Sequence, residues 1–448
     1  MAVQSFQDLV TTIRQQAERA GAAEAEVFLE YSTTLEVRIR QREIELVEQA
    51  AARGVGLRVF TDRKMGFAYT TDLRKPVLDE LIIRTMALAS QATPREENRL
   101  PAQLFQPQSG LELEDPAITA LRIEDLKNMA RAAEDNAFGR DKRIQSTRDA
   151  RAGFALSEIH FSNTYIPYQT FRGTTVWSSV TAIATQAGKN RQGEYVDRRR
   201  NLQDLDPPER VGRKAAERAL AKLGARSRPS MKVPVVFEDE AAGEFLAGLF
   251  GAFSGAEVAQ RRSFLAGRIG QTVGSSLLTI VDDGLMRRGL GTAPFDGEGV
   301  ECRRTLVVDR GTLESYLETA VSARRMNVPP TGNGFRTFDS LPTVQPSNFY
   351  IEEGNADPDK IVAGVARGLL VTGTAGFGFD LVGGGYSQQV EGLWIENGVP
   401  GAAVEGVTVA GRLDEMLQGI DAIGNRLEFR GRVAAPMLRF RELTIAGA

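Results

Sequence analysis

Alternation of apolar and polar residues is the feature that most constrains the fold of this chain. The runs VRIR at 37–40 and IELVE at 44–48 alternate in this way, within four strand-like segments at Glu26–Tyr31, Leu35–Arg40, Ile44–Ala50 and Val55–Phe60. A period of two places every second side chain on the same face of a strand. Such runs, joined by short connections, are typical of antiparallel sheets with one face in water. We therefore predict an antiparallel meander in the first part of the chain.

Helical patterns surround these segments. Apolar residues recur at helical spacing after Ser5, and further helices are predicted over 73–92, 123–138 and from Pro207 to Gly224. Residues 94–118 contain four prolines and little periodicity, which predicts a linker. We expect an N-terminal α+β domain at 1–93, followed at 94–230 by the linker and a middle α/β region that continues it.

The pattern changes after Met231 to short strands, hairpins and glycines. Asn397-Gly398 lies between two strand-like runs and is the strongest of the short hairpin signals. The 45 dispersed glycines indicate many turns and bulges. We predict that 231–448 forms a mostly antiparallel β domain, either a barrel or a sandwich. The fold class expected for the whole chain is α+β.

Composition excludes several classes of protein. The net charge of −3 argues against a dedicated nucleic-acid binder. No run reaches the roughly 18 apolar residues of a membrane-spanning helix. The first ten residues show no signal-peptide pattern, and the single cysteine, Cys302, excludes an intrachain disulfide. We therefore expect a cytoplasmic protein that binds neither membranes nor DNA directly.

One short motif raises the question of a metal site. DEAAGE, Asp239 to Glu244, begins a small-residue helical run directly after a strand-like run at 233–237. In zinc hydrolases a glutamate on a helix removes a proton from metal-bound water, and histidines hold the metal. Here Glu240 could be the base, but Asp239 and Glu244 offer only carboxylates.

Two interpretations of DEAAGE follow from chemistry alone. Carboxylates favour magnesium, calcium or manganese, and Asp282 and Asp283 of VDDG could add further ligands to a hard-metal hydrolase site. Alternatively, the acidic residues stabilise the helix dipole at its N-terminus. The only histidine, His160, cannot build a zinc site by itself.

Two other segments are candidates for contact with a ligand. Gly383, Gly384, Gly385 and Tyr386 form a glycine-rich stretch that lacks the spacing of a phosphate loop. Such a stretch lets a backbone approach a bound peptide closely, so these four residues are candidate lining elements of a peptide cavity. The basic run at 197–201 could hold a peptide carboxylate, although a solvated loop is the ordinary interpretation.

Several motifs together resemble the TldD/PmbA family, historically called modulators of DNA gyrase and now regarded as peptidases. They are TAPFDGEG at 292–299, ETAVSARRM at 318–326 with TGNG at 331–334, SNFYIEEG at 347–354, GLLVT at 368–372, GGYSQQVEGLWIENG at 384–398 and the final LTIAG. The segment GVGLRVFTDRKMGFAYTTD at 54–72 is similar to the first domain of that family. The resemblance covers almost the whole chain.

The resemblance implies one of two branches. The zinc-bearing branch carries His-Glu-x-x-x-His on a helix and a cysteine near the C-terminus, whereas the PmbA (TldE) branch lacks these ligands. On this chain Asp239 and Glu244 fall at the histidine positions, and 430–436 contains no cysteine. DEAAGE therefore resembles the remnant of a zinc helix, and we expect no metal in this chain and no catalytic residue.

What the family does gives the functional expectation. The chain would be a non-catalytic partner of a zinc-bearing paralogue, and the pair would cleave unfolded peptides inside a shared cavity. Zinc would belong to the partner. A homodimeric module that binds peptides or small ligands is the main alternative, and the hard-metal hydrolase is the other.

Overall fold

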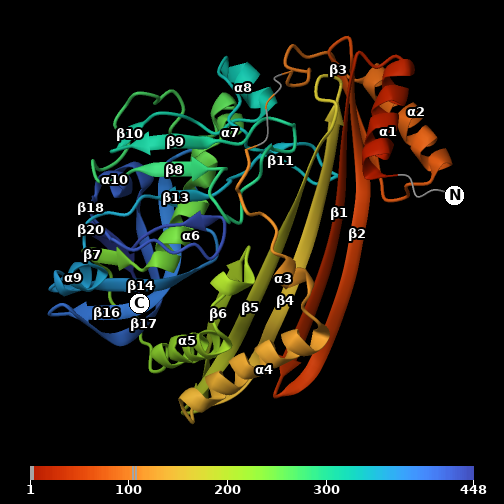
Figure 1. Cartoon of the computed structure of the whole chain (residues 1–448). Helices are drawn as coiled ribbons and strands as arrows, with labels where there is room; N and C mark the ends of the chain where they lie inside the picture. Colours follow the sequence, from red (N-terminus) through yellow and green to blue (C-terminus); the bar gives the residue numbers. More distant parts are fainter. Residues whose placement is uncertain (1–4, 103–104, 106–107, 448) are drawn as a thin grey trace.

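The computed structural model describes residues 5–102, 105 and 108–447. Its first half is built on one six-stranded antiparallel sheet with the order β3-β2-β1-β4-β5-β6 (Figure 1). The strands are β1 (Glu24–Arg40), β2 (Glu43–Thr61), β3 (Lys64–Thr70), β4 (Ile144–Asn163), β5 (Gln169–Gln186) and β6 (Lys189–Arg199).

The strands of this sheet are longer than predicted. The four separate strands expected between 26 and 60 are wrong, because β1 and β2 each run through two of them without a break. The pairing of β1 with β2 extends from Glu24 opposite Phe60 to Arg40 opposite Glu43. Gln41 and Arg42, with φ of 52° and 68°, form the tight connection. Their amides donate to the carboxylate of Glu134, at 2.9 and 2.7 Å.

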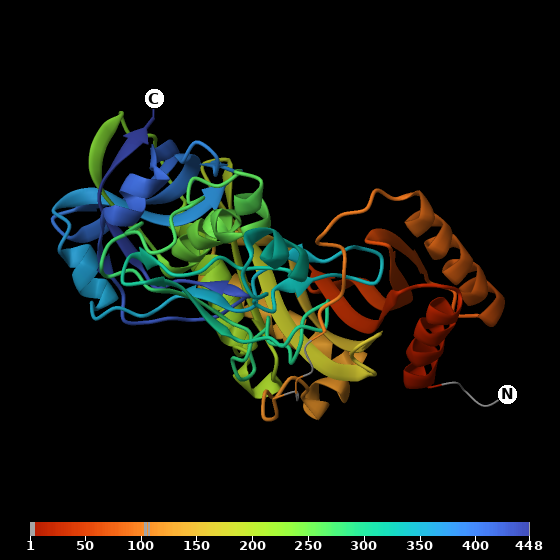
Figure 2. The same ribbon diagram turned by 90° about the horizontal axis from the view of Figure 1, so that it is seen from above.

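Helices cover this sheet at two places. α1 (Phe6–Arg19) and α2 (Lys75–Gln91) lie at one end, set apart from the C-terminal half, and α4 (Ile123–Arg140) and α5 (Pro208–Ala221) lie at the other (Figures 1 and 2). Ser5 caps α1 by accepting from the amide of Asp8 at 3.1 Å, as predicted from its position. The expected linker at 94–118 contains α3 (Pro116–Thr119) and lies partly outside the described residues.

The C-terminal half contains a closed five-stranded barrel. Its strands follow the order β14-β7-β20-β17-β16, and β16 pairs again with β14 to close it. Asn397 and Gly398, both with positive φ, form the predicted hairpin turn between β16 and β17. The barrel strands and their two short additions are β7 (Met231–Phe237), β14 (Arg367–Ala375), β15 (Phe379–Asp380), β16 (Gly385–Glu396), β17 (Val399–Arg412), β18 (Ile420–Ile423) and β20 (Leu438–Ala446).

A second, smaller sheet of short strands packs beside the barrel in the order β10-β9-β8-β13-β19. It consists of β8 (Ile280–Asp283), β9 (Arg304–Asp309), β10 (Thr312–Leu313), β13 (Phe349–Ile351) and β19 (Val433–Ala434), and β11 (Gly334–Phe335) pairs separately with β12 (Thr343–Val344). The helices of this half are α6 (Asp239–Leu249), α7 (Gly255–Ala259), α8 (Ala320–Met326), α9 (Pro358–Ala363) and α10 (Leu413–Gln418), and the 3₁₀ turns of the described residues are η1 (Leu202–Asp204) and η2 (Phe250–Phe253).

The predicted fold class is confirmed: the protein is α+β, with an antiparallel N-terminal sheet and a C-terminal β domain that contains a closed barrel. One large apolar core joins the barrel, α6 and the smaller sheet. Among the described residues, no helix combines the length and the apolar character needed to cross a membrane.

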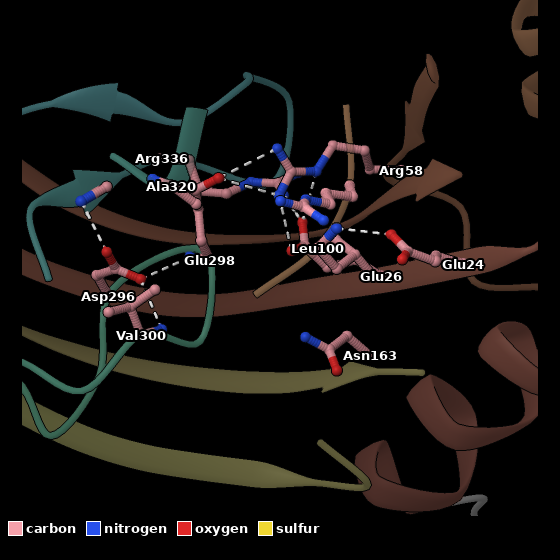
Figure 3. A network of polar contacts seen from close by, with 12 residues as sticks. Glu24, Glu26, Arg58, Leu100, Asn163, Asp296, Glu298, Val300, Ala320 and Arg336 are labelled. Atoms are coloured by element: carbon pink, nitrogen blue, oxygen red, sulfur yellow. Dashed lines mark hydrogen bonds and ion pairs between the residues drawn. The ribbon is translucent and has the colours of Figure 1, made fainter. Parts of the chain in front are cut away.

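A buried charged cluster joins the two halves (Figure 3). Arg58 of β2 donates to both carboxylate oxygens of Glu26 of β1, at 3.0 and 2.8 Å. From the C-terminal half, Glu298 lies 3.3 Å from Arg58, and Arg336 donates to Glu26 at 2.6 Å. The side chains of all four residues are at most 3% exposed. We call these four residues the buried cluster.

Candidate functional site

Helix α6, which carries DEAAGE, directly follows barrel strand β7, as the sequence predicts. The amide of Glu238, at the junction, donates to the carbonyl of Val371 in β14 at 3.0 Å, which fixes where the helix begins. Phe245 of α6 packs against Phe237 of β7 and Phe440 of β20, with ring centroids 5.9 and 5.6 Å apart. The barrel therefore sets the position of the helix.

The two faces of α6 differ in character. Ala241, Ala242, Phe245, Leu246 and Leu249 are buried against the core. The opposite face carries the acidic residues, with small residues between them that keep this surface open. Because residues three and four apart share one side of a helix, Glu240, Gly243, Glu244 and Ala247 lie along a single stripe, and this stripe borders a pocket.

The pocket, which we call the α6 pocket, has a volume of about 870 Å³. It is bounded by β6 and α5 of the first half and by α6, β14, β16, β17 and β19 of the second. Among the described residues, nine carboxylate and six basic side chains line it: Glu194, Glu217, Glu238, Asp239, Glu240, Glu244, Glu391, Glu405 and Glu428, with Arg191, Arg210, Lys214, Arg218, Lys222 and Arg430. Its lining therefore carries an excess of acidic groups.

Arg430 is the central cation of the α6 pocket. Its guanidinium forms an ion pair with Glu240, lies 3.7 Å from Asp239 and donates to Glu428 at 2.7 Å. Burial by itself would lower the pKa of Arg430, but the attraction of Glu240, Glu428 and Asp239 raises it above the usual range. The arginine is therefore held in its charged form among the carboxylates of α6.

A second arginine and a tyrosine complete this arrangement. Arg218 of α5 lies 2.7 Å from Glu240, so Glu240 contacts two guanidinium groups. Both arginines stack on the ring of Tyr195 of β6, with distances of 4.8 and 5.1 Å to its centroid. The Tyr195 hydroxyl donates to Asp206 at 2.6 Å, and burial together with this hydrogen bond raises the pKa of Tyr195. The tyrosine is therefore a fixed, neutral platform.

Family models match most of the chain. The C-terminal domain of the PmbA/TldA metallopeptidases matches 230–447, their domain 1 matches 25–89 and their central domain matches 116–223. The chain belongs to the PmbA/TldD family. Metalloprotease PmbA of Escherichia coli O157:H7 is 28% identical over 94% of this chain and 92% of its own length.

Solved structures of this family share the fold. A candidate modulator of DNA gyrase from Bacteroides thetaiotaomicron has a TM-score of 0.91 at 24% identity, with complete coverage of both chains. TldE from Thermococcus kodakarensis has a TM-score of 0.83 at 21% identity and covers 98% of this chain and 100% of its own. These likenesses cover both halves of this member of the PmbA/TldD family.

The α6 carboxylates of this PmbA/TldD member contact arginine, hydroxyl and backbone amide groups. A catalytic zinc needs about three ligands that converge on one point, most of them histidines. Here Glu240 faces two arginines, and Glu244 accepts from the hydroxyl of Thr374 at 2.6 Å and from its amide at 3.2 Å. Over residues 5–102, 105 and 108–447, no three His, Cys, Asp or Glu side chains are grouped so that they could hold a metal ion.

The proposed additional ligands, Asp282 and Asp283, have other contacts. The carboxylate of Asp282 in β8 accepts from the side-chain amide of Asn333 and from the amide of Ser347, at 2.7 and 2.8 Å. Burial raises its pKa to about 6. Asp283 accepts from the amide of Leu285 at 2.9 Å. Neither residue lines the α6 pocket.

The glycine-rich candidates lie on another side of α6. Gly385 and Tyr386 pair with β15, and the Tyr386 ring packs on Phe245 and Phe379, with centroids 5.6 and 5.0 Å apart. Gly383 and Gly384 turn back beside Asp380, whose carboxylate accepts from the amide of Gly383 at 2.9 Å. None of these four residues lines the α6 pocket, so the structure keeps them apart from Asp239 and Glu240. Tyr386 lies nearer to Glu244: burial and, to a smaller extent, the charge of Glu244 raise the pKa of the Tyr386 hydroxyl.

The basic run at 197–201 is used inside the protein. Arg199 pairs with Asp197 at 2.9 Å and with Glu428 at 3.1 Å. Arg200 donates to backbone carbonyls of the C-terminal half, among them those of Leu290 and Thr292, at 3.1 and 3.2 Å. Arg199 and Arg200 therefore connect the two halves, whereas Arg198 of the same run is exposed.

Sequence reasoning missed Tyr195, Arg218 and Arg430. The first two lie in an ordinary strand and an ordinary helix, and nothing local distinguishes them. Arg430, by contrast, begins the segment in which the resemblance placed a missing cysteine ligand. A cation in that segment is a usable signal, because an arginine there can pair with the carboxylates of DEAAGE.

Proposed function

We propose that this chain is a non-catalytic, peptide-holding subunit of a PmbA/TldD-type peptidase. In this proposal a zinc-bearing relative supplies the catalytic metal, and the α6 pocket holds a segment of an unfolded peptide. The observation that carries the proposal is the contact of Glu240 with Arg218 and Arg430. A general base must reach the proton that it removes, and here the carboxylate of Glu240 is held in ion pairs with two guanidinium groups.

The shape and charge of the α6 pocket support the binding of a peptide. Its volume of about 870 Å³ lies within the range of ordinary ligand sites. β6 is the edge strand of the six-stranded sheet, and its residues Glu194 to Val196 border the pocket. An extended peptide can add to such an edge through backbone hydrogen bonds. The acidic excess favours basic peptides over acidic ones.

A pocket-filling variant tests the binding proposal. Gly243 lies in α6 with no atom closer than 3.8 Å to the position of an added Cβ, so a large side chain there projects into the pocket without a clash near the backbone. We expect Gly243→Trp to weaken the binding of a fluorescent unfolded basic peptide at least about tenfold, a loss of roughly 1.4 kcal/mol in binding free energy. Fluorescence anisotropy measures this effect.

The matched control is Ala87→Trp, which adds the same side chain to an exposed position of α2 far from the pocket. This variant should bind the peptide like the original chain. Equal affinities for the original chain and Gly243→Trp would place the peptide elsewhere and contradict the proposal.

Catalysis is tested separately. The purified chain alone should cleave no peptide and should contain no stoichiometric zinc by elemental analysis. Cleavage should appear when a zinc-bearing family member is added. Chelator-sensitive cleavage by this chain alone would overturn the non-catalytic assignment and favour the hard-metal hydrolase.

We also propose a cytoplasmic location, supported by the single, buried cysteine.

A further inference from the structure

A second pocket lies between the two halves, and we call it the α8 pocket. It has a volume of about 560 Å³. The first half contributes β2, β3 and the segment after α2, and the second half contributes α7, α8 and β12, of which Figure 1 shows α7 and α8 beside each other. Pockets of this size between domains, with apolar walls, are usual sites for small ligands. The apolar side chains of the wall are Met65, Ala256, Val321, Leu341, Pro342 and Val344.

Most charged side chains of the α8 pocket already have partners. Arg58 and Glu298 of its wall pair with each other in the buried cluster (Figure 3). Arg325 and Glu257 each form an ion pair with a neighbour, at 2.5 and 2.7 Å. Arg95 differs, because its side chain is exposed and forms no ion pair with any described carboxylate. The pocket therefore has one positive charge at its solvent side that is available to a ligand.

Two buried acceptors beside the α8 pocket lack partners. Ser254 lines the pocket at 5% exposure and precedes α7, but its side chain makes no capping hydrogen bond. Glu318 is 1% exposed, and neither of its carboxylate oxygens has a hydrogen-bond partner among the described residues. The hydroxyl of Ser322 makes its hydrogen bonds with Thr319. Because buried polar groups nearly always have a partner, these two acceptors are available to a ligand that carries hydrogen-bond donors.

The carboxylate of Glu318 lies at the wall of the α8 pocket. A Cβ atom added to Gly255 would lie 2.0 Å from this carboxylate, which therefore occupies the space beside the glycine backbone. The residues on either side of Gly255 line the pocket, as does Thr319, which follows Glu318. The amide of Gly255 donates to the carbonyl of Leu317 at 2.8 Å and holds the two segments together. Ser254 and Glu318 thus belong to adjacent segments of one wall.

We propose that the α8 pocket binds a small zwitterion with an ammonium group at one end of an apolar body and a carboxylate at the other. The ammonium group donates to Ser254 and Glu318, and the carboxylate pairs with Arg95. The apolar body covers Val321 and Leu341. A ligand with only one charge leaves either Glu318 or Arg95 without a partner. Short apolar peptides and linear amino acids share this chemistry.

Three probes with the same six-carbon chain test the recognition of both charges. ε-Aminocaproate carries both, hexylamine carries only the ammonium group and caproate carries only the carboxylate. We expect ε-aminocaproate to bind the full chain at least about ten times more tightly than either of the others. Isothermal titration calorimetry at about pH 8 measures the three affinities. Equal affinities for the three probes, or no binding of ε-aminocaproate, would overturn the inference.

Two variants assign the two ends of the ligand. Arg95→Gln, a change at an exposed position, should weaken the binding of ε-aminocaproate about tenfold and leave that of hexylamine unchanged. Glu318→Gln should weaken ε-aminocaproate to a similar extent and should not weaken caproate. The matched control is Glu257→Gln, which changes a carboxylate of the same pocket that Arg262 already pairs, so all three affinities should persist. Variants that leave the affinity for ε-aminocaproate unchanged, or that lower all three affinities alike, would contradict the proposal.

Gly243→Trp separates this site from the α6 pocket. The inference does not rest on the proposed function, because no described residue lines both pockets. ε-Aminocaproate should therefore bind Gly243→Trp as tightly as the original chain, and a loss of binding would place the zwitterion in the α6 pocket and overturn the inference.

The dipeptide Leu-Leu, which carries the same two charges on a larger apolar body, distinguishes the two sources of the ligand. Tighter binding of Leu-Leu than of ε-aminocaproate to the original chain identifies a short apolar peptide, and weaker binding identifies a linear amino acid. Arg95→Gln should weaken the binding of whichever of the two binds more tightly.

Discussion

Two groups of arginine and carboxylate side chains join the same two halves of this molecule, and they differ in burial. In the buried cluster, Arg58, Glu26, Glu298 and Arg336 are at most 3% exposed. In the α6 pocket, the side chain of Arg430 is 17% exposed and that of Glu240 is 32% exposed. Arginine–carboxylate ion pairs are therefore shielded from water in the buried cluster and lie beside solvent in the α6 pocket.

This difference separates a structural role from a binding role. Charges that are removed from water must keep every partner, because an uncompensated buried charge is very costly. Arg336 lies between the rings of Phe28 and Phe67, at 5.1 and 5.3 Å from their centroids, so no ligand can displace it cheaply. Arg430 borders solvent, so under the proposed function its carboxylate partners can exchange it for the charges of a bound peptide.

The largest effect is expected in the buried cluster. Arg58→Met leaves Glu26 and Glu298 short of a buried cation and should lower the free energy of unfolding by about 3–5 kcal/mol. Urea unfolding followed by fluorescence measures the change. Arg58→Lys, which keeps the charge but loses the two-pronged contact with Glu26, should fall between this variant and the original chain. A loss below 1 kcal/mol for Arg58→Met would show that burial does not distinguish the two sites.

A pH dependence is expected from Glu318, which precedes α8 near the buried cluster. Burial raises its pKa from 4.5 to about 7. The folded state therefore binds this proton more tightly than the unfolded state, and the stability that results is complete below about pH 4.5 and is lost as pH rises to 7. Glu318→Gln should remove this part of the decline, on the order of 2 kcal/mol.

Glu257→Gln on the neighbouring α7 is the control for Glu318. Arg262 lowers the pKa of Glu257, so its titration lies below this pH window. Thermal unfolding between pH 5 and 8 measures both variants. Parallel pH curves for the original chain and Glu318→Gln would contradict the assignment.

A smaller effect is expected in the α6 pocket. Arg430→Met should lower the free energy of unfolding by about 1–2 kcal/mol, because Glu240 keeps Arg218 and water reaches the site. Arg210→Met, which removes a partner 3.1 Å from Asp206 and 3.8 Å from Glu428, should cost less because the Arg210 side chain is 39% exposed, and it serves as the control within the pocket. If Arg430→Met destabilises the protein as strongly as Arg58→Met, the pocket is structural and the comparison fails.

The smallest effect is expected for an exposed pair between the two halves. Arg191 of β6 lies 2.6 Å from Glu405 of β17, with 25 and 41% exposure. Glu405→Gln should change the free energy of unfolding by less than about 1 kcal/mol, because solvent screens such pairs. The same urea measurement applies, and a change as large as that of Arg58→Met would contradict the ranking by burial.

The local pattern predicted much of the fold. The strand before DEAAGE, the helix after it and the turn at Asn397-Gly398 are all present. The prediction of breaks within β1 and β2 was wrong. It arose because residues such as Ser32 and Ala51 have a weak preference for strands by themselves. Pairing with neighbouring strands holds them extended: Ser32 lies opposite Ala52 and Ser157.

The candidate site was predictable only in part. The sequence placed Glu240 on a helix after a strand, and it placed Arg430 in the segment without a cysteine. It could not show that the two side chains meet, because they are 190 positions apart. The glycine-rich segment was expected to line a peptide cavity because glycines let a backbone approach a peptide closely, and this role stays a prediction. The segment lies against Phe379 and Asp380 and does not line the α6 pocket.

The sequence by itself determined the α+β class, the antiparallel strands, the acidic helix and the resemblance to the family, because these depend on periodicity and motif order along the chain. Only the tertiary structure decided the closure of the barrel by β14 and β16, the pairing of Glu26 with Arg336, and the meeting of Arg95 and Ser254 at one pocket. The physical reason is that local periodicity fixes which face of an element is buried, whereas contacts across hundreds of residues depend on strand register and on how the two halves pack.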